Sequence, residues 1–184
     1  MIINSNTEVK DFIKVYENIL DLDDCKKIIE KSKEEKFPRA GIGSYGKKSK
    51  TRNCYAKPLN KEFDGLIFNA VGKVLSLYGK EFHFAFSQMG EDVIDTGYDH
   101  LLYKGEEKGE FVTHVDHMNE QPRKISISIL LNDDFDGGDF YFFDEYIVKN
   151  KAGGAVVFPS NFMFPHAVLP VLNGDRHAII TWIL

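Results

Sequence analysis

Residues 111–120, FVTHVDHMNE, bring together three side chains that can bind metals or transfer protons: His114, Asp116 and His117. In a β-strand alternate residues point to the same side, so His114 and Asp116 share one face. His117 then points the other way or lies in the following turn. An imidazole and a carboxylate on one face can offer two ligands to one metal ion at ~2 Å. A His-x-Asp pair alone is weak evidence, because short strings of common residues arise by chance.

The other half of such a site stands further along the chain. His166 follows Asp116 by 50 residues, and Arg176 comes ten residues later. Two histidines and one carboxylate form the facial triad of non-heme Fe(II) oxygenases, which leaves coordination positions open. A bidentate 2-oxo acid and O2 would fill them, and the planar guanidinium of Arg176 suits the distal carboxylate of that acid. In the last predicted strand Arg176 and Trp182 share one face, while His177 points away.

These residues give the chain a recognisable family resemblance over about residues 98–184. It is carried by three stretches: YKGEEKGEFVTHVD, LLNDDFDGGDFYFF and FPHAVLPVLNGDRHAIITWI. They resemble the catalytic core of the 2-oxoglutarate- and Fe(II)-dependent dioxygenases, and most of all the prolyl 4-hydroxylase branch, which includes the oxygen-sensing prolyl hydroxylases. The resemblance implies Fe(II), 2-oxoglutarate and O2 as cofactors, with ascorbate as a reductant. It places His114, Asp116 and His166 on the iron as the catalytic centre.

The resemblance also implies roles for residues around the iron. Arg176 would bind the distal carboxylate of 2-oxoglutarate, Tyr103 would hydrogen-bond this cosubstrate, and Trp182 would lie near cosubstrate and substrate. Arg123, seven residues after Asp116, matches an arginine that contacts the peptide substrate in the oxygen-sensing subset.

Three positions distinguish the chain from particular subgroups. Leu130 stands where the oxygen-sensing subset has a second cosubstrate-binding tyrosine, and Ile180 stands where it has a threonine. Collagen-type relatives usually carry lysine at the position of Arg176.

Related halogenases lack the carboxylate that Asp116 supplies, so its presence favours hydroxylation. The resemblance implies hydroxylation of a C–H bond, with release of succinate and CO2, and a prolyl residue in a peptide or protein as the preferred substrate.

Other functions stay open at this point. A free amino acid or another small molecule is an alternative substrate, and a non-catalytic β-barrel binding module could keep the same fold. The intact triad and Arg176 disfavour such a module. A nucleic-acid demethylase would need a base-accepting groove with cationic walls. The formal net charge of −5 disfavours non-specific binding to nucleic acid, apart from one basic run.

That basic run is KKSKTR at 47–52, beside Tyr45 and Tyr55. We interpret it as a solvated loop. The alternative is a lid over residues 41–55, in which Arg52 and Tyr55 would contact the substrate.

Two further motifs lack the sequence context that their usual functions require. GIGSYG at 41–46 matches GxGxxG, but the sequence predicts neither a strand before it nor a helix after it. NDDFDG at 132–137 resembles the start of a calcium loop, yet Phe143 stands at the twelfth position, where a bidentate glutamate is required. We interpret the first as a surface loop and the second as a β-turn.

The elements before the site are predicted to be helical. One helix runs through DDCKKIIEKSKEEK, with Asp21 or Asp23 as its N-cap. A second runs over roughly 60–78, where apolar residues recur with helical spacing, with Asn60 as its cap and Gly79 as its C-terminal stop.

From residue 81 the pattern changes to short strands separated by turns. The predicted strands are EFHFAFSQ, with Phe82, Phe84 and Phe86 on one face, then YDHLLY, EFVTHVD, KISISILLN, GDFYFFDEYIV, AGGAVVFP, FPHAVLPV and RHAIITWIL. We expect a mainly β (α+β) fold whose double-stranded β-helix, of the jelly-roll or cupin type, is buttressed by N-terminal helices. It forms one domain over 1–184, with helical support over 1–80 and the catalytic jelly roll over 81–184.

Composition agrees with one globular domain. The chain has 184 residues, of which 43% are apolar and 13% aromatic. No apolar run approaches the ~20 residues that cross a bilayer, and MIINSNTEVK does not resemble a signal peptide. Cys25 and Cys54 fit neither a disulfide framework nor a zinc motif, which predicts reduced thiols. We expect a cytoplasmic protein without a membrane partner, and the sequence leaves its oligomeric state open.

Overall fold

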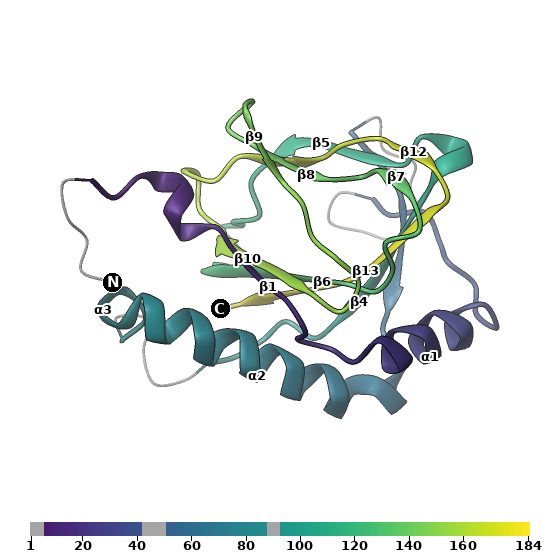
Figure 1. Cartoon of the computed structure of the whole chain (residues 1–184), viewed down its shortest axis with the longest axis horizontal. Helices are drawn as coiled ribbons and strands as arrows, with labels where there is room; N and C mark the ends of the chain where they lie inside the picture. The colour runs from purple at the N-terminus through teal and green to yellow at the C-terminus, as the bar shows by residue number, and fades with distance from the viewer. Residues whose placement is uncertain (1–5, 42–50, 88–92) are drawn as a thin grey trace.

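Two antiparallel sheets that face one another form the body of the protein, described here from a computed structural model over residues 6–41, 51–87 and 93–184 (Figure 1). The larger sheet has the order β1-β10-β6-β13-β4-β3, and the second has the order β2-β5-β11-β8-β9. A short pair, β12-β7, completes the β structure. The strands are β1 Lys14–Tyr16, β2 Arg52–Asn53, β3 Tyr55–Pro58, β4 Asp99–Lys104, β5 Glu110–His114, β6 Ile125–Leu130, β7 Asp136–Gly137, β8 Phe140–Phe142, β9 Tyr146–Val148, β10 Ala155–Pro159, β11 His166–Val168, β12 Val171–Asn173 and β13 Asp175–Ile183.

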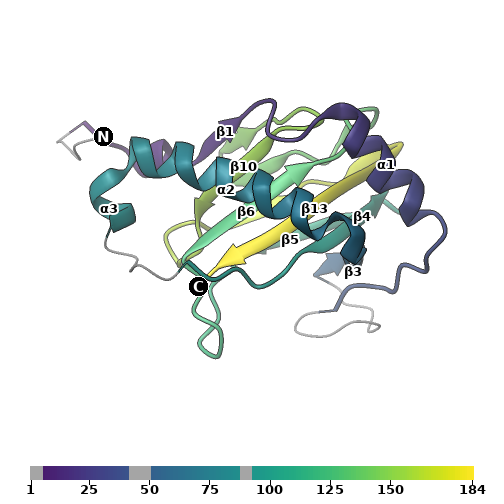
Figure 2. The ribbon, with the colours of Figure 1, turned by 90° about the horizontal axis from the view of Figure 1, so that it is seen from below.

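The helices cover the outer face of the six-stranded sheet. Figure 2 shows α2 lying across β10, β6 and β13, and α1 lying toward one end of the same sheet. The helices are α1 Leu22–Ser32, α2 Asp64–Glu81 and α3 His83–Ser87, with 3-10 turns at Val9–Phe12, Lys61–Phe63 and Gly105–Glu107. The predicted mainly β jelly-roll fold with supporting helices is therefore confirmed.

Strand β6 shows why the sheet has two different faces. Its sequence ISISIL alternates isoleucine and serine, and all six residues are buried. Ile125, Ile127 and Ile129 belong to the hydrophobic core shared with α1 and α2. Because neighbours in a strand point to opposite sides, Ser126 and Ser128 face the space between the two sheets. One face therefore anchors the helices, and the other carries polar groups into the interior.

Helix boundaries follow the predicted caps at the N-terminal ends. Asp21 caps α1 by accepting a hydrogen bond from the N–H of Asp23, and Asn60 caps the turn before α2 in the same way. The predicted stop at Gly79 is wrong, since α2 continues to Glu81. A Cβ at Gly79 would lie 3.1 Å from the ring of Phe86, so this glycine provides packing space.

The predicted strand EFHFAFSQ is also wrong, because α2 ends at Glu81 and α3 covers His83–Ser87, the described part of this stretch. Tyr78, Phe82 and Phe86 recur every four residues, which fits a helix as well as alternation fits a strand. The ring centroids of Tyr78 and Phe82 are 4.7 Å apart. Packing of Phe82 against the helix-side core therefore decides the conformation.

Several strand boundaries differ from the predicted ones. GDFYFFDEYIV is not one strand but the hairpin β8–β9, whose turn places Phe143 and Asp144 at positive φ, 58° each. FPHAVLPV divides into β11 and β12. The short strands β1, β2 and β3 lie in the region predicted as mainly helical support.

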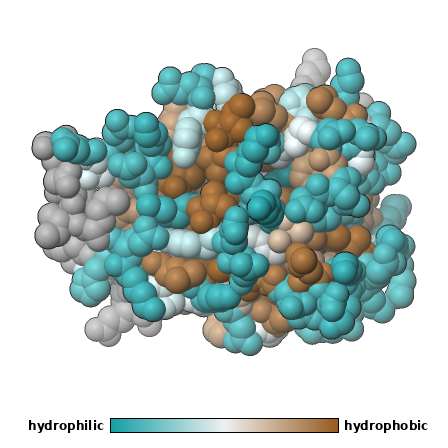
Figure 3. Space-filling view, in the orientation of Figure 1, coloured by the Kyte–Doolittle hydropathy of each residue, from teal (hydrophilic) through white to brown (hydrophobic). Residues whose placement is uncertain are grey.

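Positions 42–50 lie outside the described residues, and they hold most of GIGSYG, most of the basic run and most of the proposed lid. On the face in Figure 3, apolar patches are separated by hydrophilic side chains. Among the described helices, none combines the length and apolar character that a membrane span requires.

Candidate metal centre

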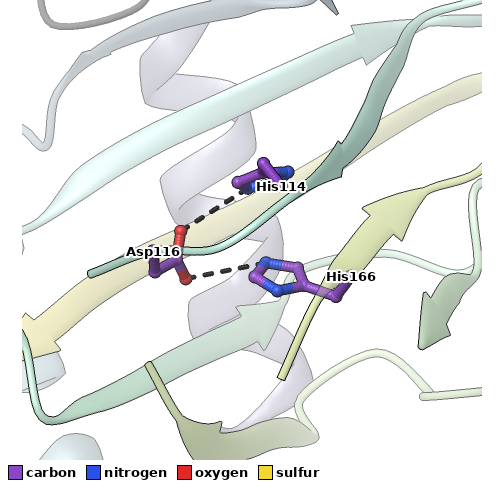
Figure 4. Close-up of side chains that lie close together, drawn as sticks. All are labelled: His114, Asp116 and His166. Atoms are coloured by element: carbon purple, nitrogen blue, oxygen red, sulfur yellow. Dashed lines mark ion pairs between the residues drawn. The ribbon is translucent and has the colours of Figure 1, made fainter. Parts of the chain in front are cut away.

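The paired strands β5 and β11 bring the two histidines together. His114 ends β5, His166 begins β11, and the two residues are direct partners across the ladder. Asp116 lies two residues beyond the end of β5 and points toward both rings (Figure 4). Its Oδ1 is 3.5 Å from Nε2 of His114, and its Oδ2 is 3.6 Å from Nε2 of His166.

Backbone carbonyls set the orientation of both imidazoles. Nδ1 of His114 donates to the carbonyl of Val112 at 2.9 Å, and Nδ1 of His166 donates to the carbonyl of Phe164 at 3.1 Å. A carbonyl only accepts, so both rings carry their proton on Nδ1. The unprotonated Nε2 atoms therefore face Asp116, which is the arrangement that metal-binding histidines use.

The carboxylate of Asp116 is buried, with 7% of the residue exposed. Burial alone would raise its pKa, but His166, His114 and the hydroxyl of Ser126 outweigh burial and hold the pKa well below its ordinary value. Ser126 donates to Oδ2 at 2.6 Å. Burial lowers the pKa of His166 despite the nearby carboxylate. The group is thus an anion beside a neutral imidazole, as ligation requires.

The donor set fits a divalent iron ion. One ligand atom from each of His114, Asp116 and His166 can be chosen so that all three lie within 4.8 Å of one another. Ligands that share a metal at about 2.1 Å lie up to about 4.2 Å apart, so small side-chain movements suffice. Two imidazoles and one carboxylate are the donors of the facial triad. His117 is exposed and lies outside this group.

A buried cation shares the cavity with this group. Arg176 is 4% exposed and lies between the rings of Tyr103 and Phe140, at 5.3 and 5.5 Å from its guanidinium carbon. Both Arg176 and Tyr103 line the cavity that holds the triad. Burial lowers the pKa of Arg176. None of the ion pairs within the described ranges includes Arg176, so its donors suit an anionic ligand.

Glycine in the NDDFDGG turn makes room for this arginine. Gly138 has φ +68°, and a Cβ there would lie 3.0 Å from Cδ of Arg176 and 2.9 Å from Val171. A side chain at this position would therefore be strained and would press on the cation. The turn thus shapes the cavity, in addition to connecting strands.

The remaining predicted site residues separate into two groups. Trp182 and Arg52 line the cavity, and Arg123 stacks on Trp182 with its guanidinium 3.6 Å from the ring centre. Arg52 lies over the ring of Phe111, 4.8 Å from its centre. Tyr55 does not line the cavity: it alternates with Ala56 in β3, and its hydroxyl donates to Glu107 at 2.6 Å.

Sequence reasoning missed three contacts of the site. Phe111 stacks on His114 with ring centroids 3.6 Å apart, and Ser126, which bonds Asp116, also bonds Ser160 at 2.8 Å. The serine at every second position of ISISIL was the available signal, since a hydroxyl inside a buried strand needs a partner. The partner itself lies outside β6 and could not be read from the pattern.

Comparison with known proteins agrees with this centre. Residues 99–184 match the model of the 2OG-Fe(II) oxygenase superfamily. A PKHD-type hydroxylase of Alteromonas mediterranea is 39% identical over 64 residues, which are 32% of this chain and 27% of that protein. Human prolyl 3-hydroxylase 1 is 41% identical over 66 residues, 33% of this chain and 9% of that protein. The matched segments thus cover less than a third of these curated relatives. The resemblance to the 2-oxoglutarate- and Fe(II)-dependent dioxygenases is confirmed.

Similar solved structures include prolyl hydroxylases. A viral collagen prolyl hydroxylase from Paramecium bursaria Chlorella virus-1 has a TM-score of 0.69 at 18% identity, covering 96% of this chain and 98% of its own. A prolyl hydroxylase from Trichoplax adhaerens, solved with a hypoxia-inducible-factor peptide, has a TM-score of 0.70 at 17% identity, covering 94% and 83%. At these identities the likeness establishes the shared fold.

Proposed function

We propose that this protein is an Fe(II)- and 2-oxoglutarate-dependent dioxygenase that hydroxylates a prolyl residue in a peptide or protein. One observation carries the proposal: the triad and the buried Arg176, without a carboxylate partner in the described part of the chain, line the same cavity. A metal site alone would not need this cation, and a simple binding module would need neither.

Each residue has a defined task in this proposal. His114, Asp116 and His166 hold the iron, and Arg176 holds the distal carboxylate of 2-oxoglutarate through charge-assisted hydrogen bonds. Tyr103 offers its hydroxyl beside Arg176. Bound iron and cosubstrate supply the oxidation, in which O2 converts C–H to C–OH while 2-oxoglutarate becomes succinate and CO2. Ascorbate would keep the iron reduced.

The walls of the cavity support the same chemistry. Apolar side chains, among them Phe111, Phe158 and Val168, line it beside the triad. They limit the access of water, and low polarity strengthens the interaction between Arg176 and a bound carboxylate.

We further propose that Arg123 and Arg52 contact the substrate. Nε of each is buried without a hydrogen-bond partner among the described residues, and so is Nε1 of Trp182. These donors favour a substrate with carbonyl or carboxylate oxygens near the reacting carbon. The orientation of Tyr55 disfavours the same role for its side chain.

The proposal is tested by measuring succinate formation from 2-oxoglutarate with and without Fe(II), in the presence of proline-containing peptides. We expect succinate only when both are supplied, together with a gain of one oxygen atom on a proline by mass spectrometry. Turnover of free amino acids alone would move the substrate assignment to the small-molecule alternative. A protein that binds neither Fe(II) nor 2-oxoglutarate would overturn the enzyme assignment.

A further inference from the structure

The carboxylate of Asp116 is held from the opposite sheet. His114 and His166 belong to the five-stranded sheet, whereas Ser126 belongs to β6 of the six-stranded sheet. Since β5 ends at His114, Asp116 lies beyond the strand ladder. Ser126 donates to its Oδ2 at 2.6 Å and is itself completely buried. This hydrogen bond therefore joins the two sheets at the candidate metal centre.

The direction of the hydrogen bonds follows from the donors available. The Oγ atoms of Ser126 and Ser160 are 2.8 Å apart, and both residues are buried. A carboxylate only accepts, so Ser126 gives its single proton to Asp116, and Ser160 gives its proton to Ser126. A hydroxyl that accepts one hydrogen bond donates the next more strongly. The hydrogen bond from Ser160 therefore strengthens the hydrogen bond that Ser126 donates to Oδ2 of Asp116.

Backbone hydrogen bonds fix Ser160 to both ends of the loop that joins Asp116 to β6. The N–H of Ser160 donates to the carbonyl of Lys124 at 2.9 Å, and the N–H of His117 donates to the carbonyl of Ser160 at 2.9 Å. The serine pair and the position of Asp116 are therefore set together.

We propose that Ser126, supported by Ser160, is a positioning residue that makes Asp116 a ligand through one oxygen. With Oδ2 engaged by the hydroxyl, Oδ1 is the oxygen that remains for the metal. A carboxylate that binds through both oxygens would take two coordination positions, and the facial triad has to keep positions open for cosubstrate and O2. The inference rests on the proposed function, because it concerns the metal of the same site.

The test measures binding of Co(II), a stand-in for Fe(II) that resists oxidation, without cosubstrate. In Ser126→Ala we expect the affinity to fall about 10–100-fold, as it does when a partner of a metal ligand is lost. The visible absorption spectrum of bound Co(II), which reports ligand number and geometry, should change as well. Ser126→Thr keeps the hydroxyl and should restore the spectrum. Ser160→Ala removes only the supporting donor and should give a smaller loss.

Thr181→Val is the matched control. It deletes a buried hydroxyl from β13, directly opposite Ile127 of β6, and this hydroxyl forms no hydrogen bond within the described residues. Unchanged Co(II) affinity and spectrum in Ser126→Ala would overturn the inference. If that variant does not fold, Ser160→Ala decides it by the same two readouts.

Different results would remove the proposed function and the role of Ser126. A wild-type protein that binds no Co(II) and forms no succinate would remove the proposed function and this inference together. A wild-type protein that does both, beside a Ser126→Ala variant with unaltered metal binding, would remove this inference alone.

Discussion

Two pairs of histidines lie within the described fold. The inner pair, His114 and His166, lines the cavity that holds the triad, and the outer pair, His100 and His177, lies on the helix-covered side of the six-stranded sheet. The rings of His114 and His166 have centroids 4.4 Å apart, and those of His100 and His177 have centroids 5.2 Å apart. In the first pair each Nδ1 donates to a carbonyl, and both Nε2 atoms face Asp116. In the second, Nε2 of His100 and Nδ1 of His177 hydrogen-bond each other at 3.0 Å.

The comparison shows that closeness alone does not make histidines a metal site. In the outer pair one nitrogen of each ring hydrogen-bonds the other ring, and the pair packs against Phe37, whose ring centroid lies 5.0 Å from that of His100. In the inner pair backbone carbonyls accept hydrogen bonds from both Nδ1 atoms, so both Nε2 atoms face the carboxylate of Asp116. Orientation by partners outside the pair, more than the distance between rings, separates a structural pair from a candidate ligand pair.

The largest effect is expected when one histidine of the inner pair is removed. His166→Ala removes one of the three ligands and should abolish iron binding and succinate formation. His117→Ala is the matched control, because His117 is exposed and outside the ligand group. Iron titration and succinate assays of both variants check the prediction. Retained iron binding in His166→Ala would contradict the assignment of the inner pair.

A substitution in the core between the helices and the six-stranded sheet should lower stability and leave metal affinity unchanged. Ile67 of α2 is completely buried in the helix-side core. Ile67→Ala should lower the free energy of unfolding by about 2–5 kcal/mol through the lost contacts and the cavity left behind. Denaturant unfolding measures the loss, and iron titration of the folded variant should match wild type. A parallel loss of iron affinity would mean that the two faces are coupled.

Removal of the Arg176 cation from the cavity should weaken the binding of the cosubstrate and leave iron binding unchanged. Arg176→Ala removes charge-assisted hydrogen bonds worth about 1.5–3 kcal/mol, which corresponds to a rise of roughly 10–100-fold in the 2-oxoglutarate concentration required. Iron affinity measured without cosubstrate should stay close to wild type. Arg176→Lys keeps the charge and should lie between the two. An unchanged cosubstrate requirement in Arg176→Ala would remove this residue from its proposed role.

The effect that is smallest near neutral pH is the pH dependence contributed by the outer pair, which grows only as the pH falls below about 6.5. Burial lowers the pKa of His177 to about 4, against nearby carboxylates, and burial with His177 and Lys57 lowers the pKa of His100 well below its ordinary value. The unfolded chain, with histidine pKa near 6.5, then takes up protons before the folded protein does. The free energy of unfolding should fall as pH drops from about 6.5 toward 4, by up to about 1.4 kcal/mol per pH unit for each histidine.

His177→Asn isolates this contribution. The variant lacks one of the two protonation sites, so its unfolding free energy should depend less steeply on pH than that of wild type over the same range. Urea unfolding at a series of pH values gives both slopes. Equal slopes would mean that the outer pair does not resist protonation in the folded protein.

The sequence predicted the chemistry of the site better than its surroundings. The spacing of His114, Asp116, His166 and Arg176 was sufficient, because ligand types and strand alternation limit what such residues can do together. The structure brings these four to one cavity, while their binding of iron and cosubstrate stays a prediction. The partners of the ligands lie on other strands, so their contacts follow from the fold and not from local pattern.

The errors in the fold have a similar cause. EFHFAFSQ satisfies two periodicities over a short stretch, and contact of Phe82 with the core selects the helix. The hairpin β8–β9 turns at Phe143 and Asp144, where neither glycine nor asparagine announces positive φ. The contact between His100 and His177 could not be read from the sequence, because they lie on strands far apart in the chain that β-pairing makes neighbours.

Strand β13 carries a consequence for how the protein folds. It lies between β6 and β4, which pair with it and not with each other, so the sheet consists of two parts until β13 joins them. Contacts between segments this distant in sequence close large loops and slow folding. Since β13 also brings Arg176 and Trp182, the cavity wall that carries these two residues should form in the last, rate-limiting stage. Pulsed hydrogen exchange during refolding would contradict this order if β13 amides gained protection before those of β6 and β10.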